Sequence, residues 1–321
     1  MEFLGHSLPT PLFLAPMAGV SDYAFRCICA RLGASVTVTE MVSSRALVYQ
    51  DKKSRGLLRK NEGSLCGAQI FGNDPEIMAE AAKLALSYSG CDFIDINMGC
   101  PMPKIAGNGD GSALMKDHAL AGRIVRAVKD AVEVPVTVKT RLGWDKSSMN
   151  AVSLARIVQD NGCDAICVHG RTRAMLYSGI ADWDELRKIV QAVSIPVIAN
   201  GDIISPEALL RCKARSGASF FMVGRGCFGD PWLFSSLAAA LADLPLPPRP
   251  PLADRMDTAM EQFELAAEDK GVHIACLEAR KHFAWYLKGV SHSSFYKEQI
   301  SKLSTPEEVR SVVKAIKRDL R

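Results

Sequence analysis

The chain has 321 residues, of which 48% are hydrophobic and 23% charged, and its mean hydropathy is +0.06. This composition is that of an ordinary folded protein and excludes a disordered, collagen-like or coiled-coil chain. A net charge of +4 is too small to indicate nucleic-acid binding by itself, and no apolar run approaches the roughly 18 residues of a membrane-spanning helix.

The N-terminus and the cysteines bear on compartment and on metal binding. The segment MEFLGHSLPT lacks the basic start and the apolar stretch of a signal peptide, so we expect a cytoplasmic protein. The ten cysteines do not repeat the CxxC spacing of a zinc or iron–sulfur site, and several lie inside apolar runs. We therefore expect free thiols, no bound metal and no membrane contact.

Eight short apolar runs follow one another along the chain and are typical of strands buried on both faces. They are residues 12–20, 36–42, 67–72, 92–99, 134–143, 165–172, 196–202 and 220–226. Helical patterns lie between them; in one, Asp74 and Pro75 mark the start and Gly90 the end. This alternation predicts a (β/α)8 barrel. A doubly wound open sheet is the alternative, but eight units and the lack of GxGxxG after the first run count against it.

A proline-rich segment separates the barrel from the C-terminal part of the chain. Residues 244–251, LPLPPRPP, cannot continue a helix and predict a stiff linker. Residues 252–321 contain several helical patterns, such as TPEEVRSVVKAIKRDLR at the C-terminus. We expect a barrel over residues 1–243 and a small all-helical domain over residues 252–321, packed on the barrel.

Polar residues stand at the ends of the predicted strands from the third onward. Functional groups of such barrels gather at the C-terminal ends of the strands. The residues found there are Gln69, Asn97, Cys100, Lys139, Arg141, His169, Arg171, Asn200, Asp202, Gly224 and Arg225. Any single one could simply fill the barrel mouth, but charged and amide side chains inside apolar strands are costly unless paired or used. The whole ring therefore indicates an active site.

The last two βα units carry a second signal. The segments ANGD and VGRG place Gly201, Gly224 and Arg225 directly after the seventh and eighth strands. Barrels commonly bind a phosphate at this place, because free backbone N–H groups and a helix N-terminus favour an anion. We expect an anion site here, although Gly201 and Gly224 alone would be unremarkable turn residues.

Two further residues have several possible roles. Lys139 ends an apolar strand and could be a Schiff-base nucleophile or the partner of an anion that develops on a cofactor ring. Cys100 lies in NMGCP, on a loop rich in glycine and proline, where its thiol can reach a ligand. General acid, nucleophile and idle thiol all remain open for Cys100 on these grounds.

A set of motifs in the chain resembles a known family. The motifs are APMAGVSD (15–22), TEM (39–41), QIFG (69–72), NMGCP (97–101), VKTRLGW (138–144), VHGRTR (168–173), IANGDI (198–203), VGRG (223–226) and ARKHFAWY (279–286). In this order they resemble the tRNA-dihydrouridine synthases, and most of all their bacterial B-type members. The resemblance covers nearly the whole chain. It implies an FMN-bearing barrel with a helical tRNA-binding domain that uses NADPH to reduce the C5=C6 bond of particular uridines.

The resemblance also implies roles for individual residues. Cys100 would be the general acid that protonates C5 of the uracil, while hydride passes from flavin N5 to C6. The implied FMN-binding residues are Pro16, Met17, Ala18, Gln69, Lys139, His169, Asn200, Gly201, Asp202, Gly224 and Arg225. The implied substrate and tRNA contacts are Asn97, Arg141, Arg171, Arg280 and Lys281. Without the resemblance, Arg280 and Lys281 would be read as part of the solvated basic face of an amphipathic helix. We expect a monomer.

Three other functions compete with this one. An FMN oxidoreductase of free pyrimidines, of the dihydroorotate dehydrogenase type, shares barrel, flavin and phosphate site but has no need of the helical tail. A Schiff-base lyase would use Lys139 and would be colourless. A non-enzymatic RNA-binding protein would leave the polar ring at the strand ends unexplained.

Overall fold

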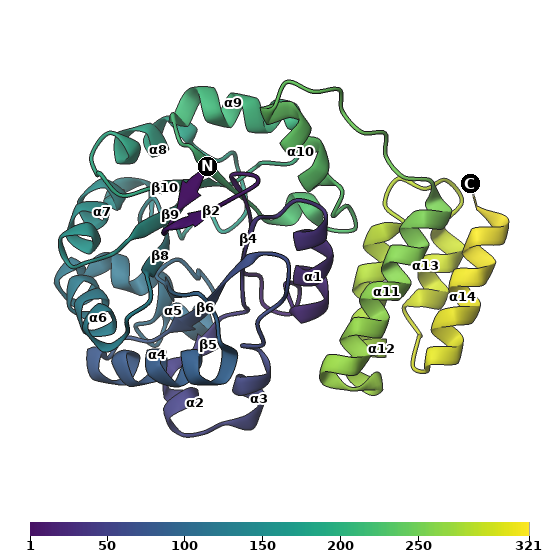
Figure 1. Ribbon diagram of the computed structural model, residues 1–321, viewed down its shortest axis with the longest axis horizontal. Helices are drawn as coiled ribbons and strands as arrows, with labels where there is room; N and C mark the ends of the chain where they lie inside the picture. Colours follow the sequence, from purple (N-terminus) through teal and green to yellow (C-terminus); the bar gives the residue numbers. More distant parts are fainter. Residues whose placement is uncertain (321) are drawn as a thin grey trace.

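The computed structural model describes residues 1–320 and contains a barrel with a group of helices beside it (Figure 1). Within these residues, eight parallel strands close into a ring, because β4 pairs with β3 on one side and with β6 on the other. The barrel strands are β3 (Leu12–Leu14), β4 (Val36–Val38), β6 (Leu65–Phe71), β7 (Phe93–Asn97), β8 (Val136–Arg141), β9 (Ala165–His169), β10 (Val197–Asn200) and β11 (Phe220–Val223). The predicted (β/α)8 barrel is confirmed.

Helices alternate with the strands and cover the outside of the barrel (Figure 1). The main ones are α1 (Tyr23–Arg31), α4 (Pro75–Ser89), α6 (His118–Ala131), α7 (Ala151–Asp160), α8 (Trp183–Val190), α9 (Pro206–Ser216) and α10 (Leu233–Leu241). Shorter helices in the loops are α2 (Ser44–Val48), α3 (Lys52–Gly56) and α5 (Pro103–Ala106). Helix α4 has the predicted ends: the Asp74 side chain accepts from the N–H groups of Glu76 and Ile77, and Gly90 adopts φ 62°.

Two segments near the N-terminus differ from the expected strands. Strand β3 ends at Leu14, and the rest of the run 12–20 forms a loop, since Pro16 has no N–H for the sheet ladder. The strand expected to reach residue 42 breaks after Val38, and a separate strand β5 (Val42–Ser43) pairs with the end of β6. Both breaks bring loop residues to the mouth of the barrel.

Aromatic rings fill the end of the barrel at which the strands begin. The chain starts with a hairpin of β1 (Glu2–Phe3) and β2 (His6–Ser7), which the sequence did not predict. The ring of Phe3 lies 4.9 Å from that of Phe13 and 5.0 Å from that of Phe220. These rings belong to the apolar cluster inside the barrel, while a larger cluster lies between the strands and the outer helices.

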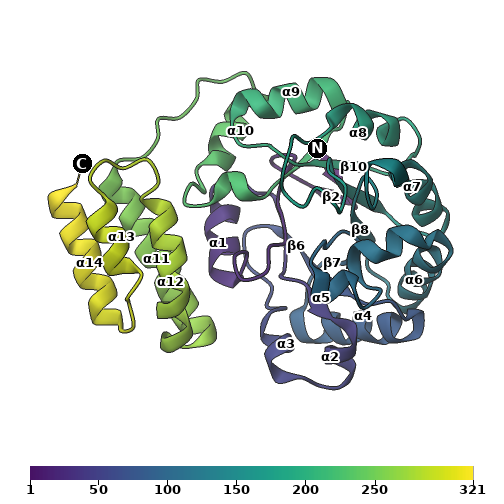
Figure 2. The same ribbon diagram turned by 180° about the vertical axis from the view of Figure 1, so that it is seen from behind.

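The C-terminal helices form their own apolar core. They are α11 (Leu252–Lys270), α12 (Val272–Tyr286), α13 (Ser294–Ile300) and α14 (Pro306–Asp319), and residues 244–251 connect them to α10 in extended form (Figure 2). Helix α13 had no counterpart among the predicted helical patterns. Along residues 1–320, no helix is both long and apolar enough to cross a membrane.

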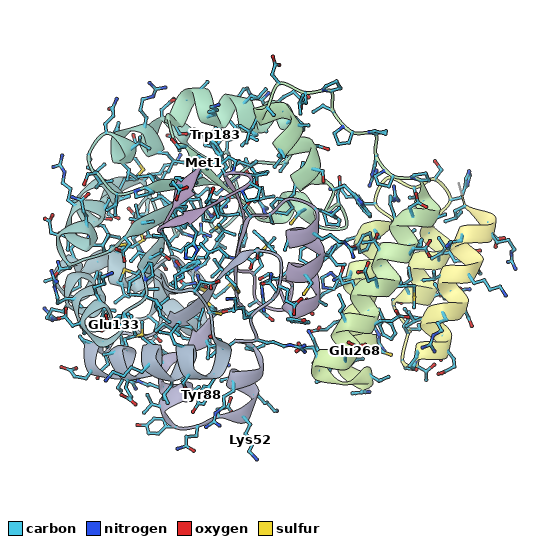
Figure 3. All side chains as sticks on the ribbon, in the orientation of Figure 1. Met1, Lys52, Tyr88, Glu133, Trp183 and Glu268 are labelled. Carbon is cyan, nitrogen blue, oxygen red and sulfur yellow. The ribbon has the colours of Figure 1, made fainter. Side chains whose placement is uncertain are left out.

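The helical tail packs against α1 of the barrel. Side chains fill the space that the ribbon leaves open between α1 and the tail (Figure 3). Ala24 of α1 belongs to the apolar core of the tail, and the Phe25 ring lies 5.6 Å from that of His282. The ion pairs Arg31–Glu261 and Arg59–Asp269 flank this contact. The tail is therefore joined to the barrel by a packed interface as well as by the connection.

Candidate active site

A cavity of about 510 Å³ opens at the end of the barrel where the strands finish. Its volume falls in the range of roughly 300–1,000 Å³ found for small-molecule sites. Fourteen of the predicted site residues line it: Pro16, Met17, Ala18, Gln69, Asn97, Cys100, Lys139, Arg141, His169, Asn200, Gly201, Asp202, Gly224 and Arg225. Within the described structure, Arg171, Arg280 and Lys281 are not part of its wall.

A chain of buried polar side chains underlies one wall of the cavity. The Asp95 carboxylate accepts hydrogen bonds from Thr137 Oγ1 and from Gln69 Nε2, both at 2.6 Å. Gln69 Oε1 in turn accepts from Asn97 Nδ2 at 2.9 Å. Because a carboxylate only accepts, Asp95 fixes which way the Gln69 amide faces, and Gln69 then fixes Asn97. Burial raises the pKa of Asp95 to about 6.

The Asn97 side chain holds the loop that carries Cys100. Asn97 Oδ1 accepts from the backbone N–H groups of Gly99 at 3.1 Å and of Cys100 at 2.8 Å. Arg141 Nε donates to the carbonyl oxygen of Gly99 at 2.9 Å. Burial raises the pKa of the Cys100 thiol above its ordinary value, so the thiol keeps its proton at neutral pH. Cys100 is therefore a positioned thiol at the cavity wall.

Lys139 and His169 bring two further polar groups to the cavity. Lys139 Nζ lies 3.3 Å from Asn200 Oδ1, and Asn200 Nδ2 donates to the carbonyl oxygen of Met222 at 2.8 Å. Burial, together with the surrounding positive charges, of which Arg141 is the foremost, lowers the pKa of His169 well below its ordinary value. His169 is therefore a neutral imidazole beside a fixed cation.

The predicted anion site lies where the loops after β10 and β11 meet. Gly201 adopts φ 117° and Asp202 φ 54°, so two successive residues have left-handed backbone, which only glycine adopts without strain. A Cβ on Gly201 would lie 2.8 Å from the Ala181 Cβ. Gly224 and Arg225 border the same corner of the cavity. The corner combines close-packed backbone with a cation, as an anion site requires.

Arg171 supports this corner from behind. Its guanidinium is 2% exposed, donates to Asp202 Oδ2 at 2.7 Å and contacts the carbonyl oxygens of Ser178 and Gly179 at 2.9 and 2.7 Å. The Ala181 N–H donates to the same Asp202 oxygen at 2.8 Å. The Asp202 carboxylate thus binds Arg171 through Oδ2, while its other oxygen lies 3.7 Å from the Arg225 guanidinium.

Tyr177 is a wall residue that the sequence analysis missed. Its ring lies 4.8 Å from the Arg225 guanidinium carbon and 5.6 Å from that of Arg141, within the range of cation–π contacts. It stands well beyond the end of β9, in a loop, so the strand-end rule does not reach it. Asp95 was also missed, although a carboxylate inside the apolar segment FIDIN is the same signal that identified Lys139.

The two tail residues with a predicted tRNA role lie on α12. Arg280 Nε donates to the carbonyl oxygen of Leu303, within the tail, at 2.8 Å. Lys281 Nζ instead crosses to the barrel and donates to the carbonyl oxygen of Gly19. The structure thus separates two neighbours that the sequence had grouped together, and their tRNA contacts remain predictions.

The cavity combines the groups needed to hold a planar ring with a phosphate tail. Pro16, Met17 and Ala18 provide an apolar wall, Gln69 and Lys139 provide polar contacts, and the loops after β10 and β11 provide the anion corner. A protonated thiol lies on the same cavity. Such a set can hold a cofactor and deliver one proton to a bound substrate.

Comparison with known proteins finds one family that matches nearly the whole chain. A family model described as Dihydrouridine synthase (Dus) matches residues 13–321. The chain is 42% identical over 303 residues to tRNA-dihydrouridine synthase B of Pseudomonas aeruginosa, covering 93% of this chain and 90% of that protein. It is 38% identical over 309 residues to tRNA-dihydrouridine synthase B of Vibrio cholerae, covering 96% of each.

Solved structures share the fold at low sequence identity. Histamine dehydrogenase from Rhizobium sp. 4-9 superimposes with a TM-score of 0.59 at 15% identity, over 82% of this chain and 50% of that one. The 6-hydroxypseudooxynicotine amine oxidase of Pseudomonas geniculata N1 gives a TM-score of 0.57 at 16% identity, over 74% and 48% of the two chains. At such identities the likeness concerns the barrel architecture alone.

Proposed function

The chain belongs to the dihydrouridine synthase family, an enzyme family, and from this premise we propose that it reduces the C5=C6 bond of uridines in tRNA. FMN is the proposed cofactor and NADPH the proposed reductant. The observation that carries the proposal is that one cavity joins an apolar wall, an anion corner, the Lys139 ammonium and the protonated thiol of Cys100.

The residues around the cavity fit FMN by their chemistry. Pro16, Met17 and Ala18 would back the ring, and Gln69 would bond its polar edge with the hydrogen-bonding capacity that Asp95 and Asn97 leave free. Lys139 would stand by the part of the ring that becomes negative on reduction. The anion corner of Gly201, Asp202, Gly224 and Arg225 would hold the ribityl phosphate, with Asp202 contributing its backbone.

FMN, when bound in this cavity, would supply the hydride chemistry. The protein's own side chains would hold the uracil and provide the proton. Cys100 Sγ keeps its proton at neutral pH because burial raises its pKa, and it would pass that proton to C5. Asn97 fixes the backbone of Cys100 and, with Arg141, would face the uracil. His169 stays neutral and would contact FMN without adding a charge.

The target base has to leave its stack to reach this cavity, because the site lies at the bottom of a barrel mouth. We propose that the helical tail, residues 252–321, holds the tRNA during this step and that the contacts include Arg280. The charges of the tail are mixed, which suits recognition of RNA by shape and phosphate contacts.

The proposal is tested by titrating the purified protein anaerobically. We expect a visible flavin spectrum that bleaches with NADPH and returns on addition of an unmodified tRNA transcript, with dihydrouridine appearing in the RNA. Dihydroorotate and free uracil serve as matched controls and should leave the oxidation state unchanged.

A colourless protein that takes up no FMN would refute the proposal. Reoxidation by free pyrimidine, with none by tRNA, would instead favour an oxidoreductase of the dihydroorotate dehydrogenase type.

A further inference from the structure

The loop between β3 and α1 forms a tight turn on the wall of the cavity. The Val20 N–H donates to the Met17 carbonyl oxygen at 2.9 Å, and the Met17 N–H donates to Ser21 Oγ at 2.7 Å. Gly19 occupies the third position of the turn with φ 71°, where the turn requires a left-handed residue. Pro16, Met17, Ala18 and Val20 line the cavity around it. The shape of this turn therefore sets the shape of the wall against which the ring of the proposed cofactor would lie.

The apex of the turn is held from outside by two charged side chains. The Gly19 N–H donates to the Glu40 carboxylate, which follows β4, and the Gly19 carbonyl oxygen accepts from Lys281 Nζ of α12. Glu40 is 6% exposed and Lys281 is half-buried. The backbone of one residue, Gly19, is thus held by the barrel through its N–H and by the tail through its carbonyl oxygen.

The neighbouring loop of the cavity mouth, which follows β11, also contacts α12. Phe228 lines the cavity and stacks on Trp285, with ring centroids 4.4 Å apart and planes at 18°. Gly229, with φ 66°, lies so close that a Cβ there would be 2.1 Å from the carbonyl carbon of Trp285. Two separate loops of the mouth therefore rest on the same helix.

One face of α12 makes all of these contacts. Glu278, Lys281, His282 and Trp285 are spaced as i, i+3, i+4 and i+7, so they share a face of the helix. Lys270 bridges Glu278 to Asp22, the residue that caps α1 just after the turn. The Lys281 ammonium faces the barrel from this stripe and donates to the turn. Asp22, Glu278 and Lys270 are the charged groups around the Glu40 carboxylate on the other side of the turn.

We propose that Lys281 is a positioning residue for the cofactor, through which α12 holds the cavity turn at Gly19, and that it is not a tRNA contact. In this inference, the identity of the cofactor rests on the proposed function. The hydrogen bond from Lys281 to the Gly19 carbonyl oxygen does not. The helical tail then serves the active site directly, in addition to binding RNA.

Hydrogen exchange in the full-length protein tests whether Lys281 holds the turn at Gly19. In Lys281→Met, which keeps the length of the side chain and removes its donor, the amides of residues 17–21 should exchange about tenfold faster than in the wild type. Lys281→Arg should recover most of the protection, since a guanidinium can donate to the same carbonyl. Lys288→Met, a substitution at an exposed lysine just past α12, should leave these amides unchanged.

Two binding titrations on the same variants separate the possible roles of Lys281. FMN should bind about tenfold more weakly to Lys281→Met, while affinity for an unmodified tRNA transcript stays within about twofold of wild type. Unchanged exchange in Lys281→Met, or equal acceleration in Lys288→Met, would overturn the inference. So would a loss of tRNA affinity with the turn still protected, which would restore Lys281 as an RNA contact. If the wild type takes up no FMN, the proposed function fails, and the exchange experiment still decides whether Lys281 holds the turn.

Discussion

The mouth of the barrel and the outer face of the helical tail use polar side chains in opposite ways. At the mouth, Asp95, Gln69 and Asn97 are buried and bonded to one another, and the cavity depends on their exact orientations. On the outer face of the tail, pairs such as Lys302–Glu298 are largely exposed to solvent, with side chains 71% and 70% exposed. Exposed pairs contribute little to stability, whereas buried polar groups are costly unless they are bonded or used.

The contrast teaches where polar residues carry information about function. A buried amide or carboxylate in an apolar strand has a specific task, and the mouth contains several of them. A charge on the outer face of a tail helix is consistent with solubility alone. The two patterns meet at α12, where Lys281 and His282 lie between the regions.

The largest effect is expected from a substitution that removes the proposed proton donor in the barrel and leaves the tail intact. Cys100→Ala should lower the single-turnover rate of dihydrouridine formation about 100-fold or more, because the thiol that holds the proton is lost. FMN content and tRNA affinity should stay unchanged. Cys27→Ala, at another partly exposed cysteine, is the control and should react normally. A wild-type rate in Cys100→Ala would remove the general-acid assignment.

The next largest effect is expected from a substitution that disrupts the packed contact between the barrel mouth and α12. Gly229→Ala places a Cβ 2.1 Å from the carbonyl carbon of Trp285, so we expect the free energy of unfolding in urea to fall by about 3 kcal/mol. Gly289 has a similar φ of 78°, but a Cβ there would meet nothing within 4 Å. Gly289→Ala should therefore cost only about 1 kcal/mol. Equal losses in the two variants would contradict a close-packed joint.

The smallest effect concerns pH at the same joint. Burial lowers the pKa of His282 to about 4, against about 6.5 in an unfolded chain. Above pH 6.5 both states are neutral; as the pH falls below it, the unfolded state binds the proton first, and stability is lost until about pH 4. Between pH 7 and pH 5, His282 should therefore remove about 2 kcal/mol.

Urea unfolding of the wild type and of His282→Phe at both pH values measures this contribution. Asp22, Lys270 and Lys281 also face the imidazole and are present in both proteins, so the difference isolates the histidine. An identical pH dependence in the two proteins would show that His282 titrates normally.

Much of the barrel could be predicted from local signals. Asp74, Pro75 and Gly90 mark the two ends of α4 in the sequence, and the apolar runs mark the strands. Because parallel strands end at one face of a barrel, residues as distant as Gln69 and Arg225 could be assigned to one cavity before any coordinates.

The remaining features depend on geometry that the sequence pattern does not contain. The helical period places Lys281 and Trp285 on one face, but it does not reveal that Gly19 and Phe228 lie opposite them. Arg171 follows the end of β9 by two residues, yet its guanidinium lies behind Asp202 and outside the cavity wall. In each case the partner comes from an element that packs at a distance along the chain.

The phenyl rings of Phe3, Phe13 and Phe220 at the base of the barrel have a consequence for access to the cavity. They make the cavity a dead end, so whatever reaches its floor arrives and departs through the mouth. Under the proposed function, the reductant and the target uridine would both have to use this single opening.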